Sequence, residues 1–216
     1  MKKNFVLFVL FVLPIVAYLF FASGVNSFTT LPTLTPKIPD LGKWKSLRND
    51  TVKLDKKITV LGFGGTALLK NRGNYFNLNE KIYQRYHEFK DLQFVIICPL
   101  GTENDARHII DSFSRTTDVS QWNFVFAPVN EIEEFYNNLQ LKRDKLGPDF
   151  GTANVYIVDK DRNLRGRKID NEKEYKEGYS TFHVSELSNE MLDDFKIVLY
   201  EYRAALKKNN NAEKRI

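Results

Sequence analysis

The sequence predicts an α/β domain with a mixed β-sheet flanked by helices, preceded by one N-terminal transmembrane helix. Two apolar runs, residues 58–63 and 93–98, have the length and composition of strands buried on both faces. A turn-rich segment, 159–163, separates two further strand-like runs and predicts a hairpin. Apolar residues at helical spacing over about 189–207 predict a closing helix. Parallel crossovers followed by a hairpin and a helix give a mixed sheet between helices.

The other elements follow from the spacing of apolar residues and from the positions of glycine and proline. A short strand is expected at 52–54, and Gly64-Gly65 ends the strand at 58–63. Ser188 is expected to cap the last helix. The elements expected between these are a helix at 78–89, a helix at 103–113, a strand at 122–126, a helix capped by Asn130, and hairpin strands at 153–158 and 164–167.

The N-terminal residues predict a membrane anchor. Lys2 and Lys3 precede an uncharged apolar run, 5–22, whose helical length of roughly 27 Å is close to the thickness of the hydrocarbon core. The leading lysines favour a cytoplasmic N-terminus, so we expect a single-pass protein of the cytoplasmic (inner) membrane with its domain in the periplasm. The alternative is a cleaved signal peptide with a cleavage site near Ala22-Ser23-Gly24. Both interpretations place the rest of the chain outside the cytoplasm.

Composition divides the chain into four segments. After an anchor at 1–22, residues 23–41 are rich in serine, threonine and proline, which predicts an extended linker. Residues 42–207 have the right length for one domain, and 208–216 form a basic tail.

The net charge of +5 comes from the two ends of the chain. Lys2, Lys3, Lys207 and the basic tail account for all of it, so the residues between them carry no net charge. A domain without a positive excess lacks the electrostatic signature of nucleic-acid binding, and we expect no nucleic-acid partner.

The chain has a single cysteine, Cys98, at the end of the apolar run 94–98. One thiol cannot form an internal disulfide, and a dithiol reaction within the chain is therefore excluded. A buried lone cysteine behaves as a small apolar residue. The alternative, a reactive thiol, requires exposure and a lowered pKa.

The element order resembles that of the thioredoxin-like superfamily, and the hairpin segment Val155–Arg167 resembles that of its Sco/SenC copper-chaperone branch. The Leu164-Arg165-Gly166 step and the sequence Asp-Asp-Phe-Lys at 193–196 carry the closer resemblance. It covers roughly residues 52–207 and implies a thioredoxin-like fold.

Members of this branch bind copper through a Cys-x-x-x-Cys pair and a distant histidine. Here the corresponding loop, 64–69, has no cysteine, and the histidine position falls near Gly151. His87, His108 and His183 share no ligand spacing. We therefore expect no catalytic residue, no metal ligand and no cofactor, because the scaffold lacks the branch's reactive groups.

The sequence is consistent with two alternative functions of different classes. The first is a non-catalytic binding or assembly factor that contacts a protein partner, for example during assembly of respiratory or other envelope complexes. The second is a thiol redox or copper-handling protein that works through Cys98 or with a partner chain. For the first, the expected partner contact is an apolar patch of Phe63, Leu68, Leu69 and Phe150. The alternative arrangement is that these side chains fold inward and close the empty site.

Overall fold

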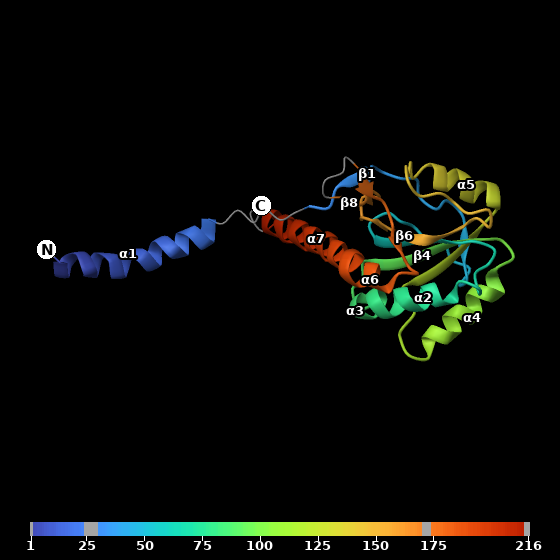
Figure 1. Cartoon of the computed structure of the whole chain (residues 1–216), viewed down its shortest axis with the longest axis horizontal. Coiled ribbons are helices and arrows are strands. Elements are labelled where there is room, and N and C mark those ends of the chain that lie inside the picture. The colour runs from blue at the N-terminus through green and yellow to red at the C-terminus, as the bar shows by residue number, and fades with distance from the viewer. Residues whose placement is uncertain (1, 24–29, 170–173, 214–216) are drawn as a thin grey trace.

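A computed structural model describes residues 2–23, 30–169 and 174–213 (Figure 1). The predicted anchor coincides with helix α1, Lys2–Ser23, which contains Pro14. No helix among these described residues is long and apolar enough to cross a membrane. Residues 24–29 of the predicted linker and the end of the basic tail, 214–216, lie outside the described residues.

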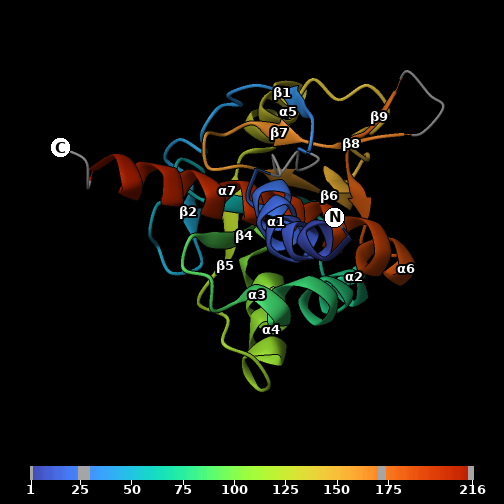
Figure 2. The same cartoon turned by 90° about the vertical axis from the view of Figure 1, so that its left-hand side faces the viewer.

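A mixed sheet forms the centre of the domain, as predicted (Figure 2). The strand order is β1-β7-β6-β3-β4-β5-β2, with β10 also paired to β6. Strands β3, β4 and β5 are parallel, and β6 runs antiparallel to β3. The strands are β1 Thr33–Thr35, β2 Lys45–Ser46, β3 Ile58–Gly64, β4 Leu92–Pro99, β5 Trp122–Ala127, β6 Gly151–Val158, β7 Leu164–Arg165 and β10 Tyr179–Ser180, and a separate pair is β8 Arg167–Lys168 with β9 Tyr175–Lys176.

Helices cover both faces of this sheet. One apolar core lies between the sheet and α2, α4 and α7, and a second lies between the sheet, α5 and the N-terminal segment 38–54. Figure 1 shows α5 on the opposite side of the sheet from α2 and α4. The helices are α2 Arg72–Leu78, the π-helix η1 Asn79–Tyr83, α3 Gln84–Tyr86, α4 Glu103–Ser114, α5 Val129–Asn137, α6 Val184–Glu186, the π-helix η2 Leu187–Met191 and α7 Leu192–Glu213.

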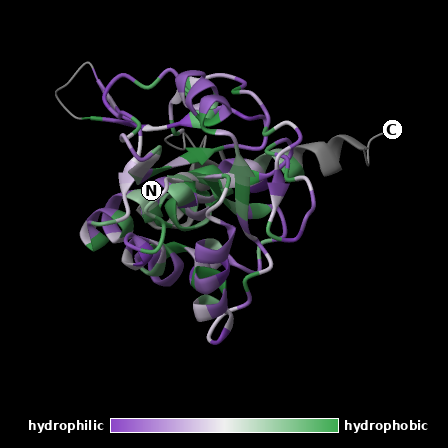
Figure 3. Ribbon diagram, turned by 90° about the vertical axis from the view of Figure 1, so that its right-hand side faces the viewer, coloured by the Kyte–Doolittle hydropathy of each residue, from purple (hydrophilic) through white to green (hydrophobic). Residues whose placement is uncertain are grey.

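The two cores explain the unbroken apolar runs in the sequence. Neighbouring residues of one strand point to opposite faces, so Val60 of β3 enters the first core and Leu61 the second. Every residue of β3 and β4 is buried as a result. Figure 3 shows these central strands in the hydrophobic colour and much of the outer helices in the hydrophilic one.

Several predicted element boundaries were wrong. Val52 and Leu54 are buried but form no strand, and the edge strand is β2, which pairs with β5. Their alternating burial comes from packing against the second core rather than from a strand ladder. The helix expected at 78–89 begins at Arg72 and passes through η1. Ser188 lies inside η2 and caps nothing, and α5 begins after Pro128 rather than after Asn130.

The domain begins earlier than residue 42. Strand β1 pairs with β7, and the side chains of Leu31, Ile38 and Leu41 are buried, so this part of the predicted linker belongs to the fold. These buried apolar residues hold the segment against the domain. They stand singly among prolines, so the average composition of the segment does not reveal that it is part of the fold. At the other end, α7 continues through 208–213, where a separate tail was expected.

Arg165 connects three parts of the domain from a buried position in the hairpin. Its Nη1 donates a hydrogen bond to Asp159 at 2.9 Å, and its Nη2 donates to Glu201 of α7 at 2.8 Å. Its Nε donates to the carbonyl of Leu31 at 2.8 Å. The Leu31 amide donates in turn to Glu201 at 3.0 Å. One guanidinium therefore holds the hairpin, the last helix and the start of the domain together.

A second contact joins the hairpin region to α7. Arg167 donates to both carboxylate oxygens of Asp194, at 2.8 and 3.0 Å, and the Tyr179 hydroxyl donates to the same carboxylate at 2.6 Å. Asp194 is buried. The residues that carry the family resemblance are thus structural contacts between the hairpin and the last helix.

We expect Arg165→Leu to lower the free energy of unfolding by about 3 kcal/mol, because it leaves two carboxylates unpaired in a buried site. Urea unfolding of the full chain in a mild detergent measures this. Lys196→Gln, which removes an exposed ion pair with Asp193, is the matched control and should leave the midpoint unchanged. An Arg165 variant as stable as this control would contradict the role of the network.

Candidate functional site

The loop after β3 and the segment before β6 meet at one edge of the sheet, as the sequence predicts. Gly64 pairs with Gly151 at the end of the β3–β6 ladder. The Thr66 amide donates a hydrogen bond to the carbonyl of Asp149 at 2.8 Å. This junction is where the resemblance places a cysteine pair and a histidine, and here it is built from backbone alone.

Glycine is required at two positions of this junction. Gly65 has φ +66°, and a Cβ added there would lie 2.8 Å from the Asp149 carbonyl oxygen and 2.9 Å from Gly151 Cα. A Cβ on Gly64 would lie 2.5 Å from Leu68 Cδ1 and 2.8 Å from Cys98 Sγ. The space beneath the loop is therefore already filled by the side chains of Leu68 and Cys98. A larger residue at either position would displace the backbone or these side chains.

Cys98 is completely buried, which confirms the expectation from its apolar neighbours. Its thiol donates to the carbonyl of Ile96 at 3.6 Å. Burial raises the pKa of the Cys98 thiol far above its ordinary value, although hydrogen bonds with the Thr102 side chain and the Gly64 backbone act in the opposite direction. The thiol is consequently held in its protonated, unreactive form.

The predicted apolar patch is only partly present. Phe63 is buried in the second core, with its ring 4.9 Å from that of Tyr136, and Leu68 is buried in the first core. Leu69 is 37% exposed, and Phe150 is half-buried with φ +62°. Of the two arrangements considered, the exposed one is wrong for Phe63 and Leu68, which fold inward, and the exposed patch is reduced to Leu69 and the half-buried Phe150. Phe63 faces the core as a strand residue, and Leu68 turns inward beneath Gly64.

Leu69 lies beside a small cleft between α2 and α4. Its volume is about 300 Å³, and Arg72, Phe76 and His108 are among its lining residues. Phe76 is 40% exposed and its ring contacts Phe113 edge-on at 4.9 Å. Sequence reasoning missed Phe76 because it began the helix at residue 78 rather than at Arg72. We call this surface the Leu69 cleft.

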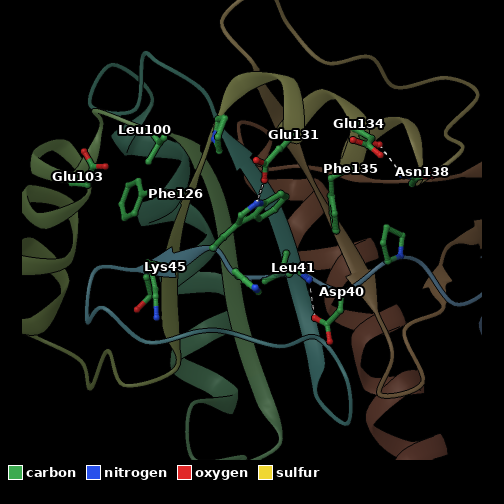
Figure 4. Close-up of a pocket in the computed structure, with 16 residues that line it drawn as sticks. Asp40, Leu41, Lys45, Leu100, Glu103, Phe126, Glu131, Glu134, Phe135 and Asn138 are labelled. Atoms are coloured by element: carbon green, nitrogen blue, oxygen red, sulfur yellow. Dashed lines mark hydrogen bonds between the residues drawn. The ribbon is translucent and has the colours of Figure 1, made fainter.

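A larger groove lies beyond the ends of β4 and β5 and was not predicted (Figure 4). Its volume is about 800 Å³. We call it the Trp44 groove, and the residues used below are Trp44, Leu100, Glu103, Phe126, Glu131, Glu134 and Phe135. They come from the N-terminal segment, the loop after β4, β5, α4 and α5. No local sequence pattern marks them, because the fold alone brings them together.

The three histidines occupy separate places. His87 Nδ1 lies 3.0 Å from the Gln84 carbonyl oxygen, and His183 Nδ1 lies 3.1 Å from the Ser180 hydroxyl. His108 lines the Leu69 cleft. Within the part of the chain that the structure describes, no three His, Cys, Asp or Glu side chains are grouped so as to hold a metal ion.

Comparisons with known proteins show the fold. No family model matches the chain, and no curated protein matches it. A candidate electron transfer protein from Aquifex aeolicus VF5 has 14% identity and a TM-score of 0.50, covering 78% of this chain and 98% of its own. BsSco, a member of the Sco family of cytochrome c oxidase assembly proteins, has 13% identity and a TM-score of 0.46, with coverage of 75% and 99%.

The soluble domain of Sco1 from Bacillus subtilis is also similar, with 16% identity and a TM-score of 0.44, covering 77% of this chain and 94% of its own. At such identities the similarity concerns the fold only. The chain has a thioredoxin-like fold, with Sco proteins among the solved structures that resemble it, and its single cysteine leaves it without a cysteine pair.

We expect Cys98 to resist alkylation by iodoacetamide in the folded full chain at pH 8 and to react fully in urea, because burial keeps its thiol protonated. Cys98→Ser should lower the free energy of unfolding by about 1–3 kcal/mol, since it places a hydroxyl in an apolar site. Mass spectrometry and urea unfolding provide the two measurements. Rapid modification of the folded chain would show that the thiol is accessible.

Proposed function

We propose that this chain is a membrane-anchored, extracytoplasmic thioredoxin-like protein that acts by binding another protein, without thiol or copper chemistry of its own. The observation that carries the proposal is the filled space beneath Gly64. Leu68 and Cys98 occupy the volume under the loop where a thioredoxin relative would hold reactive side chains. The scaffold is complete, and binding is the activity that it can still perform.

The alternative is a redox or copper-handling protein that uses Cys98. Attack on a partner's disulfide requires an accessible thiolate, whereas Cys98 is buried and its thiol pKa is raised. Copper coordination by the same sulfur also requires loss of its proton. Either reaction would first have to open the loop between Gly64 and Leu68. The binding proposal needs no such rearrangement.

The Leu69 cleft is the surface that we propose for the partner. Leu69, just before α2, and Phe76, within α2, are each more than a third exposed, and Arg72 and His108 line the same cleft. An apolar surface with a polar border is typical of protein contacts. The sequence resemblance to the Sco/SenC branch supports a partner engaged in assembly of respiratory or other envelope complexes.

The proposed location follows from the sequence of the first residues. The apolar run 5–22 behind Lys2 and Lys3 supports an uncleaved anchor with the domain outside the cytoplasm. Such an anchor would keep the Leu69 cleft close to partners in the same membrane. A cleaved signal peptide would release the domain instead.

We expect the full chain to stay in the membrane fraction after a high-salt wash and to retain its residues 5–22, because this uncharged apolar run follows Lys2 and Lys3 and would prefer the hydrocarbon core to water. Fractionation and N-terminal mass spectrometry of the mature protein measure this. A mature N-terminus near Val25, or release by salt, would contradict the anchor while leaving the binding proposal open.

We expect Leu69→Asp to reduce crosslinked partner capture in the native membrane by about tenfold or more, because it places a charge in the centre of the proposed contact. Leu69 is partly exposed, so the substitution should leave the domain folded, which circular dichroism checks. The control is Phe182→Asp, at a side chain 68% exposed that does not line the cleft. Unchanged capture by a folded Leu69→Asp chain would rule out this surface as the partner contact.

A further inference from the structure

The Trp44 groove has a rigid aromatic wall. The Trp44 indole N–H donates a hydrogen bond to the Glu131 carboxylate, and the Trp44 ring packs edge-on against Phe135 with 5.5 Å between centroids. Phe135 is buried and part of the second core. The indole is therefore held in place by α5 while it remains half-exposed to the groove. A rigid aromatic surface loses little conformational entropy when it is covered by a ligand.

Leu100 adds an exposed apolar side chain to the same groove. It follows β4 directly and is 60% exposed. Its backbone is nevertheless fixed, because the Leu100 amide donates to the Ala127 carbonyl at 3.0 Å. The groove thus presents a large apolar side chain from an ordered position, with Phe126 below it in the lining.

The charges of the groove are mainly acidic, in a chain whose net charge is +5. Four carboxylates line it, against the two lysines Lys43 and Lys45. Asp40 accepts hydrogen bonds from the amides of Leu41 and Leu54, and Glu131 accepts one from Trp44. For the other two, Glu103 and Glu134, no cation lies within ion-pair distance among the described residues.

These two unpaired carboxylates stand on opposite sides of the groove. Figure 4 shows Glu103 near Leu100 and Phe126, and Glu134 near Phe135, with Glu131 between them. Each acidic group is therefore next to an apolar surface. A ligand that matches this arrangement carries a cation at each end of an apolar group.

We propose that the Trp44 groove binds an extended peptide segment of a partner protein in which an apolar side chain lies between two basic ones. Alternate residues of an extended peptide point to one face, so a basic-x-apolar-x-basic sequence presents all three side chains to the groove. The apolar side chain covers Trp44 and Leu100, and the cations approach Glu103 and Glu134. The inference rests on the proposed function in one respect, namely that the chain acts by binding proteins.

The test uses the two tryptophans as reporters. The full chain is labelled with ¹⁵N-tryptophan in a neutral detergent, which gives one indole N–H signal for Trp44 and one for Trp122. Trp122 is buried in the first core and is the internal reference, and Trp44→Phe assigns the signals. The probe is a capped seven-residue peptide with lysine, leucine and lysine at alternate positions and serine elsewhere. Its counterpart has glutamate in place of lysine.

We expect the lysine peptide to shift the Trp44 signal saturably while the Trp122 signal stays in place, and the glutamate peptide to shift neither. Glu103→Gln combined with Glu134→Gln should weaken binding of the lysine peptide by about tenfold, since two exposed ion pairs are lost. Leu100→Ser should weaken it as well. The matched control, Glu88→Gln with Asp111→Asn, removes two exposed charges outside the groove and should have no effect.

Three results would overturn the inference: no shift of the Trp44 signal, an equal shift with the glutamate peptide, or an affinity for the lysine peptide that the Glu103 and Glu134 substitutions leave unchanged. The peptide-binding inference and the proposed function can be contradicted independently of each other. Partner capture that depends on Leu69 would still support a binding role with the Trp44 groove unused. Loss of that dependence with intact peptide binding would leave the groove as the contact surface.

Discussion

The close approach of two backbone segments at Gly64-Gly65 and Gly151 determines the rest of the candidate site. At this point β3 ends against β6, and a side chain on Gly65 would collide with the opposing backbone. The loop must therefore cross directly above Leu68 and Cys98, which fill the space below it. Turning the Leu68 side chain outward would lose about 2–3 kcal/mol of apolar burial and leave a cavity. Closure of the site is thus a stable packing arrangement.

The remainder of the scaffold does not depend on that site. Arg165 and Arg167 are held by carboxylates of the hairpin and α7, far along the chain from the loop after β3. Buried charges of this kind fix the relative positions of elements more than they add net stability. The hairpin and the last helix can therefore keep their geometry whatever residues follow β3. This separation explains how a thioredoxin-like fold persists here with a single, buried cysteine.

Sequence analysis predicted the parts of the structure that arise from burial on two faces. The runs 58–63 and 93–98 correspond to β3 and β4 because a strand covered on both sides must be apolar throughout. It failed where short strands depend on distant partners, as for β1 and β2. It also left open whether Phe63 and Leu68 face the surface or the interior. The direction of each side chain depends on its packing partners, Tyr136 for Phe63 and Cys98 below the loop at Leu68, and both partners lie far away in the sequence.

The loops that follow the parallel strands contribute to the Trp44 groove and to the Leu69 cleft. The Trp44 groove lies where the chain after β4 continues into α4 on one face of the sheet and the chain after β5 continues into α5 on the other, whereas the Leu69 cleft lies between α2 and α4 on the same face. Side chains in these loops are not needed for the strand ladders, so their chemistry can change without loss of the fold. In this chain the loop after β3 has no cysteine and lies over Leu68 and Cys98. The neighbouring loop exposes Leu100 from an ordered backbone, next to Glu103, which has no cation beside it in the described structure. A partner that covers Leu100 and brings a cation to Glu103 gains both apolar burial and an ion pair from this arrangement.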